Sequence, residues 1–134
     1  MSDCIFCKIA NGEIPSHKVY EDECCIAILD VCPVAKGHTL VIPKQHAQDL
    51  FALSEEEAAE IMKRVRHVAG LLSDGLKPDG VNLMQNNGAA AGQTVMHFHM
   101  HVIPRFAGDD VKINWHMPQA DTETLAALCK EITG

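Results

Sequence analysis

Three histidines alternate with apolar residues in one short stretch of the chain, His97-Phe98-His99-Met100-His101-Val102-Ile103. Successive side chains of a β-strand point to opposite faces of a sheet. The alternation therefore predicts a strand, expected over residues 97–105, with three imidazoles on one face and apolar residues for a core on the other. Three histidines in strict alternation are hard to obtain on a strand face without a function. The fold must therefore contain a sheet with one chemically active face.

Strand and helix patterns cover most of the remaining chain. Apolar, β-branched runs bounded by turn residues predict strands at 17–22, 24–30, 38–43 and 80–86. Ser54 and Glu57 form a capping-box pattern at the start of a helix expected to run to about residue 73. One face of this helix carries Ala58, Met62, Val65, Ala69 and Leu72. Shorter helices are expected at 4–10 and near 121–131. Together these elements predict an α+β fold with a largely antiparallel sheet, in a single domain over residues 1–134.

The charge of the chain argues against one broad class of function. With a net charge of −7 and no strongly basic stretch, the protein lacks the clustered lysine and arginine that nucleic-acid binding requires. A bound phosphate would have to be held by local donors such as backbone amides, side-chain amides and histidines. No apolar run approaches the roughly 20 residues that span a bilayer, and the first residues do not resemble a signal peptide. We therefore expect a cytoplasmic protein that contacts neither nucleic acid nor membrane.

Two kinds of chemistry remain open for the three histidines. The first is a metal site, because neutral imidazole is a common zinc ligand, and the second is nucleophilic and acid–base chemistry on a phosphate. The preceding loop, residues 86–94, favours the second. Its glycines and alanines allow a ligand to approach the backbone closely, and Asn86, Gln93 and Thr94 supply uncharged donors. Such a loop suits an anion, whereas a metal site would not need it.

Several separated segments resemble the histidine-triad (HIT) family, in particular its Hint-like and bacterial branch. The alternating histidines meet the family pattern in full. Further matching segments follow in the family's order: Ile14-Pro15, Tyr20-Glu21-Asp22, Asp30, Gly37–Lys44, Gly92-Gln93-Thr94-Val95 and Pro104-Arg105. The resemblance covers roughly residues 4–105, and residues 106–134 form an extension beyond it. It implies a five-stranded, mainly antiparallel sheet with one long helix and short flanking helices, usually in a homodimer.

The resemblance also implies an activity. Family members bind nucleoside monophosphates and hydrolyse nucleoside phosphoramidates or related conjugates, here expected to be purine nucleotides cleaved at the alpha-phosphorus through a phosphohistidine. His99 would be the nucleophile, and His101 would contact the phosphate and the leaving group. His97 and His38 would belong to a proton relay. The nucleotide would be bound by Asp30 at the ribose, by Asn86, Gly92, Gln93 and Thr94 at the phosphate, and by Phe6, Ile9, Ile28 and Val31 at the base.

Two alternatives stay open. The segments at 92–95 and 104–105 also resemble the branch of the family that cleaves diadenosine polyphosphates. The other alternative belongs to a different class of function: a zinc-stabilised nucleotide-binding or scaffold protein with little turnover. An intact histidine triad speaks against this last reading.

Cys4 and Cys7 have the spacing of a metal-ligand pair, which is only half of a site. A redox role competes with this interpretation, but redox Cys-x-x-Cys motifs normally follow a strand, and only three residues precede Cys4. The resemblance to bacterial relatives supplies two further ligands, His46 and His97, for a structural zinc ion. His97 could then not serve the relay in the same way, and zinc would orient His99 indirectly. The other four cysteines are expected to be small buried side chains: Cys24, Cys25, Cys32 and Cys129.

Overall fold

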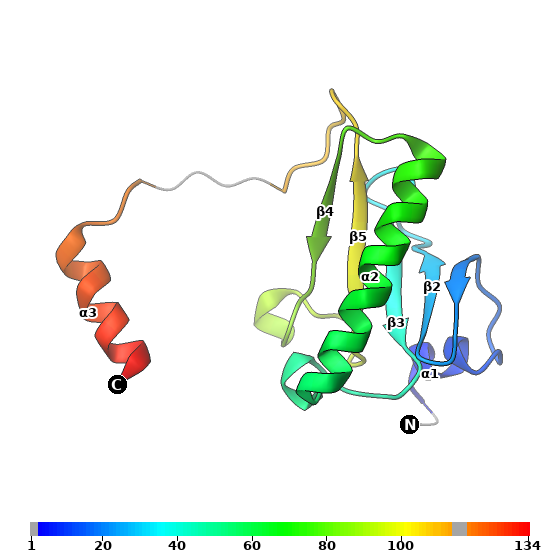
Figure 1. Cartoon of the computed structure of the whole chain (residues 1–134), viewed down its shortest axis with the longest axis horizontal. Coiled ribbons are helices and arrows are strands. Elements are labelled where there is room, and N and C mark those ends of the chain that lie inside the picture. Colours follow the sequence, from blue (N-terminus) through cyan, green and yellow to red (C-terminus); the bar gives the residue numbers. More distant parts are fainter. Residues whose placement is uncertain (1–2, 114–117) are drawn as a thin grey trace.

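A five-stranded antiparallel sheet forms the centre of the protein. The structure is a computed structural model that describes residues 3–113 and 118–134. The strands within these residues are β1 (Lys18–Glu21), β2 (Cys25–Leu29), β3 (Thr39–Pro43), β4 (Gly80–Met84) and β5 (Met100–Arg105). All pairings are antiparallel, in the order β1-β2-β3-β5-β4 (Figure 1). The predicted α+β class and the predicted sheet are thereby confirmed.

Three α-helices accompany the sheet in the described part of the chain: α1 (Ile5–Ala10), α2 (Glu55–Leu76) and α3 (Thr122–Thr133). The predicted capping box starts α2, because the Ser54 hydroxyl accepts from the Glu57 amide and the Glu57 carboxylate accepts from the Ser54 amide. The helix continues about one turn beyond residue 73 and ends at Leu76, and its C-cap residue Lys77 is left-handed with φ 54°. The sequence patterns do not predict the short 3-10 turns at Leu50–Ala52 and Ala89–Ala91.

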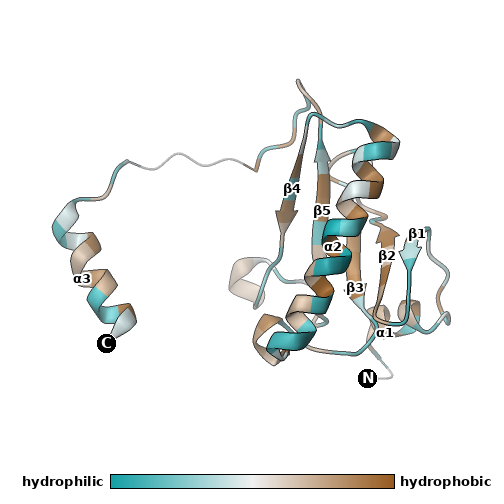
Figure 2. Cartoon of the chain, viewed as in Figure 1, coloured by the Kyte–Doolittle hydropathy of each residue, from teal (hydrophilic) through white to brown (hydrophobic). Residues whose placement is uncertain are grey.

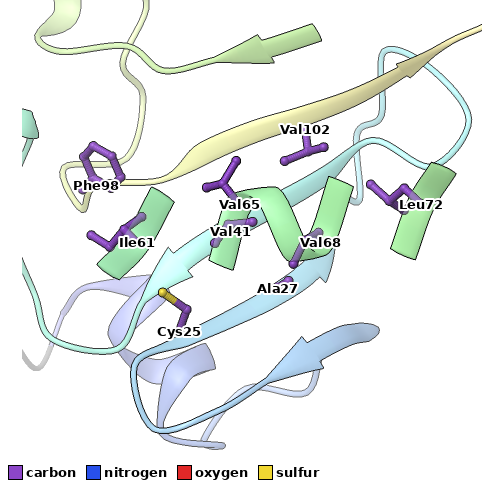
Figure 3. Close-up of a cluster of buried hydrophobic side chains, with 9 residues drawn as sticks. All are labelled: Cys25, Ala27, Val41, Ile61, Val65, Val68, Leu72, Phe98 and Val102. Carbon is purple, nitrogen blue, oxygen red and sulfur yellow. The ribbon is translucent and has the colours of Figure 1, made fainter. Parts of the chain in front are cut away.

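α2 covers one face of the sheet and buries a single stripe of side chains there. Figure 3 shows this stripe pointing at the strands, and its members are Ile61, Val65, Val68 and Leu72. The predicted face is partly wrong, because Met62 is 48% exposed and Ala58 and Ala69 are only half-buried. The two stripes share Val65 and Leu72. Apolar spacing alone does not decide which of two overlapping stripes meets the sheet.

The opposite face of the sheet carries α1 and a second apolar cluster. Phe6 and Ile9 of α1 pack there on alternate residues of the two central strands, namely Ile26, Ile28, Leu40 and Ile42. The intervening residues face α2, for example Ala27 and Val41. β2 and β3 are therefore covered on both sides, which makes the sheet a rigid support for whatever its α1 face carries.

The histidine segment shows its predicted alternation of faces, although its regular strand is shorter than predicted. β5 begins at Met100, because the Phe98 amide donates to the Ala47 carbonyl at 2.7 Å instead of to a neighbouring strand. Phe98 and Val102 belong to the core under α2, and Met100 packs against it. His99 and His101 face the other side, toward α1.

α3 stands apart from the sheet and from α2 (Figure 1). Every residue from 118 to 134 is exposed, including a stripe formed by Leu125, Leu128 and Ile132. Figure 2 shows apolar and polar residues alternating along this helix. Cys129 lies on it, so the expectation of burial is wrong for Cys129, and also for Cys32, which is exposed as well. No helix in the described ranges has both the length and the apolarity needed to cross a membrane.

Candidate functional site

Two cavities meet at the histidines on the α1 face of the sheet. The first, of about 420 Å³, is walled mainly by apolar residues of α1 and β2. The second, of about 630 Å³, extends between the loop after β2, the end of β4 and the segment after β5. Four residues line both cavities: Asp30, Thr94, His99 and His101. A ligand that reaches from one cavity into the other would therefore pass these four side chains.

The first cavity contains the four residues predicted to bind a base. Phe6, Ile9 and Ile28 are buried in its wall, whereas Val31 is 87% exposed and lies at its rim. The ring of Phe6 meets the ring of His99 edge to face, with centroids 4.9 Å apart and planes at 85°. The apolar wall thus ends directly at an imidazole.

The backbone fixes the tautomer of His99. Its Nδ1 lies 2.7 Å from the His97 carbonyl oxygen, which can only accept, so Nδ1 carries the proton. The Nε2 atom of the neutral ring is therefore unprotonated and has a free lone pair. His99 is 7% exposed and borders both cavities. This is the state that a nucleophilic imidazole requires.

A second backbone contact fixes the tautomer of His38 and, through His38, the tautomer of His101. The Val34 amide donates to His38 Nδ1 at 3.1 Å, so the proton of a neutral His38 must lie on Nε2. That atom donates to His101 Nδ1 at 2.9 Å, which leaves the remaining proton of His101 on Nε2. Burial and the neighbouring imidazoles of His99 and His38 lower the pKa of His101 to about 4, and burial lowers the pKa of His38. Both rings are thus neutral at pH 7, as this chain of hydrogen bonds requires.

Asp30, His38 and His101 lie close enough together to be considered as a metal site. The tautomer of His38 argues against that use. Its Nε2 atom, 3.5 Å from Asp30 and 2.9 Å from His101, holds the proton because Val34 occupies Nδ1. A metal-bound nitrogen must instead present a lone pair. The trio therefore fits a proton relay better than a metal site.

The loop before β5 contributes donors to the second cavity. Asn86, Gly92 and Thr94, which the sequence analysis expects to bind phosphate, line this cavity. Gly92 is left-handed with φ 96°, a conformation that favours glycine, and its Cα faces the Asn86 side chain. Gln93 has a different place. Its buried amide accepts from the Gly88 amide and donates to two loop carbonyls, those of Gln48 and Val95. It holds the loop together and does not line either cavity.

A second cluster lies at the start of α1. Its four ligand atoms, from Cys4, Cys7, His46 and His97, all lie within 4.8 Å of one another. Cys4 Sγ is 3.3 Å from His97 Nδ1, and Cys7 Sγ is 3.4 Å from His46 Nδ1. The edges of a tetrahedral zinc site with two sulfur and two nitrogen ligands are about 3.3–3.8 Å, from its bond lengths. The spacing of the donors fits such an ion.

The tautomer of His97 agrees with this fit. Its Nε2 donates to the Pro43 carbonyl at 2.8 Å, so the lone pair of Nδ1 points at the cluster. The side chain is completely buried. The His97 side chain faces the two thiols, and its main-chain carbonyl contacts His99. This arrangement favours metal binding over the proton relay for the His97 side chain.

The segment after β5 is a wall of the second cavity that the sequence reasoning missed. Asp110, Val111, Lys112 and Ile113 line the cavity. Arg105 holds this segment in place through two bonds to Asp109, at 2.9 and 2.7 Å, and one to the Val111 carbonyl at 3.0 Å. The Arg105 guanidinium keeps the pKa of Asp109 well below its usual range. An arginine followed four residues later by aspartate, with Gly108 between them, is the signal that could have indicated it.

Comparisons with known proteins agree with this architecture. The sequence model of the HIT domain matches residues 11–108. "Protein hit" of Bacillus subtilis is 49% identical over 108 residues, which cover 81% of this chain and 74% of that protein. An adenosine 5′-monophosphoramidase of Schizosaccharomyces pombe is 40% identical over 131 residues, covering 97% and 96%. An adenylylsulfatase of Arabidopsis thaliana is 43% identical over 104 residues, covering 78% and 53%. The fold and site define a small α+β protein of the histidine-triad type. The chain belongs to the HIT family.

Solved structures extend the likeness to the whole chain. A protein from Streptococcus mutans superposes with a TM-score of 0.95 at 44% identity, over 99% of this chain and 85% of that one. A zinc-bound histidine-triad protein from Mycobacterium smegmatis superposes with a TM-score of 0.79 at 38% identity, over 98% and 97%. Residues 118–134 are about an eighth of the chain. A score of 0.95 over nearly all residues therefore requires α3 to superpose as well.

Proposed function

We propose that the protein hydrolyses purine nucleoside phosphoramidates at the alpha-phosphorus. One observation carries the proposal: His99 and His101 border both cavities, so a phosphate between the cavities would touch a free imidazole lone pair and an imidazole N–H together. The apolar first cavity would take the base, and Asp30 would take the ribose. The second cavity would take the leaving group. Similarity to an adenosine 5′-monophosphoramidase supports this assignment.

The reaction would proceed in two displacements. His99 Nε2 attacks phosphorus while the bond from phosphorus to the leaving nitrogen breaks, and His101 gives its Nε2 proton to that nitrogen. Water then attacks the phosphohistidine, which releases the nucleoside monophosphate, and its proton returns to His101. The His97 carbonyl, as acceptor of the Nδ1 proton, stabilises the positive charge that His99 gains on attack.

The remaining contacts of the phosphate are uncharged. Asn86, Thr94 and the backbone around Gly92 border the second cavity and would bind the phosphoryl oxygens. Gln93, predicted to bind the nucleotide, would act indirectly by holding this loop. His38 would keep His101 in the tautomer that donates to the leaving group.

We also propose that Cys4, Cys7, His46 and His97 hold a structural zinc ion. The donor set, the spacing and the His97 tautomer support it, as does similarity to a zinc-bound relative. Such an ion would link α1 to the start of the histidine segment. Purified protein should then carry about one zinc per chain, and Cys4→Ser should lower both zinc content and thermal stability. Cys129→Ser, which changes an exposed cysteine of α3, is the control. Absence of metal from protein purified without chelator would contradict the proposal.

A homodimer is the third part of the proposal. α3 presents Leu125, Leu128 and Ile132 to solvent and contributes no buried residue. The corresponding helix of a relative superposes on α3, so the same position recurs in another protein. Contacts within one chain do not explain this position, because α3 buries no residue. A second copy of the chain, with its own α3, would cover these side chains.

The catalytic proposal is tested by turnover, binding and trapping of the intermediate. Wild-type protein should cleave adenosine phosphoramidate, and rapid-quench mass spectrometry should find the adduct on His99. His99→Ala should abolish turnover yet keep nucleotide binding, while His101→Ala should slow turnover by about 10²–10⁴-fold. His67→Ala, which changes an exposed histidine of α2, should be unaffected. Near-normal turnover in His99→Ala would sink the nucleophile assignment.

A panel of leaving groups separates the alternatives. Adenosine phosphoramidate, adenylyl sulfate and diadenosine polyphosphates are compared by kcat/KM. Preference for a diadenosine polyphosphate would overturn the phosphoramidase reading in favour of the second branch of the family. Tight binding of nucleoside monophosphate without turnover of any of these compounds would support the scaffold reading instead.

A further inference from the structure

We propose that Phe6 couples the metal cluster to the nucleotide site. A metal ion held by the cluster would raise the affinity for a purine nucleoside monophosphate, and the nucleotide would raise the affinity for the metal by the same factor. The inference rests on the proposed function, because it takes the apolar cavity beside His99 to be the base site. It goes beyond a structural zinc ion, since it makes metal occupancy a determinant of ligand affinity.

The first step concerns the stability of α1. The helix has six residues, too few to be stable alone. Its N-cap is Cys4, whose sulfur accepts from the Cys7 amide at 3.4 Å, and sulfur is a weak acceptor. Both cysteines of the cluster therefore stand in the first turn of α1. A metal that bridges them to His46 and His97 would anchor the helix to the rest of the fold.

The second step concerns the contacts of Phe6, which lies between the two cysteines in sequence. Its ring meets the His97 ring edge to face, with centroids 6.0 Å apart, and the His99 ring with centroids 4.9 Å apart. One buried side chain thus touches both a member of the metal cluster and the proposed nucleophile. No flexible segment intervenes between these rings, so displacement of one affects the others.

The third step concerns the cavity wall. Ile5, Phe6 and Ile9 of α1 line the apolar cavity, and Phe6 and Ile9 also pack on the sheet. Any loosening of α1 would change the shape of this wall. Ligand and metal would thus favour the same ordered position of α1. Two ligands that favour one state of a shared element strengthen each other's binding reciprocally.

The test measures affinity instead of activity. Binding of AMP is measured by calorimetry to zinc-loaded protein and to protein stripped with chelator and then desalted. We expect AMP to bind about 10-fold more weakly to the stripped protein, a typical size for such coupling. In the reciprocal measurement, AMP should slow zinc release from the loaded protein to a colorimetric chelator. This second measurement starts from loaded protein, so it decides the question even where the stripped protein does not fold.

Two variants separate coupling from simple loss of contact. Phe6→Leu should retain zinc and bind AMP, with AMP no longer slowing zinc release. Ile14→Ala changes another residue of the same cavity, outside α1, and should weaken AMP binding while leaving the coupling intact. Equal AMP affinity with and without zinc, or full coupling in Phe6→Leu, would overturn the inference and leave the proposed function standing. Absence of AMP binding to the loaded protein would overturn both.

Discussion

At the scale of single residues, main-chain groups decide the chemistry of the site. The His97 carbonyl fixes the proton of His99, and the Val34 amide fixes that of His38. These contacts set which ring nitrogen has a free lone pair and which carries the proton. A substitution that keeps every histidine but moves the Val34 loop would therefore alter the reaction. In the proposed reaction, the direction of proton transfer depends on the backbone as much as on the imidazoles.

The pKa of His101 gives the first prediction. Burial and the neighbouring imidazoles of His99 and His38 lower it to about 4, below the value of about 6.5 in the unfolded chain. Below pH 6.5 the unfolded chain therefore binds a proton that the folded chain does not. The resulting stability is fully present above about pH 6.5 and is lost as the pH falls toward 4, with a slope of at most about 1.4 kcal/mol per pH unit.

Urea unfolding checks this pH dependence of stability. Wild-type protein and His101→Asn are prepared identically and measured at about pH 5 and about pH 7.5. We expect the free energy of unfolding to fall less steeply with acidification in the variant. The same pH dependence in both proteins would show that His101 is not the group responsible.

The sequence could predict most residues that line the candidate site but not their hydrogen-bond partners. Alternation placed His99 and His101 on one face, and the loop composition indicated donors beside them. The Pro43 carbonyl at His97 and the Gln48 carbonyl at Gln93 belong to segments distant in the sequence, and the Val34 amide reaches His38 through the shape of the loop between them. No local sequence pattern predicts these contacts.

At the scale of elements, the ends and faces were harder to predict than the elements themselves. The capping box located the start of α2 correctly because it is a contact between near neighbours. The buried stripe was predicted correctly at Val65 and Leu72 but not at Ile61 and Val68, because the sheet selects the stripe and the helix alone does not. β5 started late for a similar reason, since Ala47 captures the Phe98 amide. The segment from 106 to 113 has no apolar periodicity, and the spacing of Arg105 and Asp109 is its one local signal.

The corrected face of α2 gives the second prediction, which compares two adjacent residues. Ile61 is 3% exposed and belongs to the core, whereas Met62 is 48% exposed. Ile61→Ala should lower the free energy of unfolding by about 2–5 kcal/mol, since it leaves a cavity. Met62→Ala should change it by no more than about 0.5 kcal/mol. Chemical denaturation of both variants makes the comparison, and a larger loss in Met62→Ala would restore the face first predicted.

At the scale of the whole molecule, the position of α3 is not explained by contacts within one chain. The sequence predicted the helix from its pattern but could not place it, because its apolar residues find no partner within the described part of the chain. Likeness to a solved relative shows that the placement recurs. We infer that the element belongs to an assembly more than to its own domain.

The third prediction therefore concerns assembly. Wild-type protein should have twice the mass of 14.6 kDa in light scattering at micromolar concentration. Leu128→Asp, in the middle of the exposed stripe, should shift it toward the monomer. Ala127→Asp places the same charge outside the stripe, about 100° around α3 from Leu128, and should leave the dimer intact. A monomeric wild-type protein would remove this part of the proposal.

The order of strands also has a consequence for how the chain folds. β1, β2 and β3 follow one another as neighbours, and β4 pairs with β5, but the two groups join only where β3 pairs with β5. Thr39 and Val102, which face each other there, are about 60 residues apart in the chain, so this closure is the slow, long-range event. Asp30 and His38 lie on one side of that seam, and His99 and His101 on the other. Nucleotide should thus slow unfolding while leaving the rate of refolding almost unchanged, because the binding site is assembled only when the seam has closed.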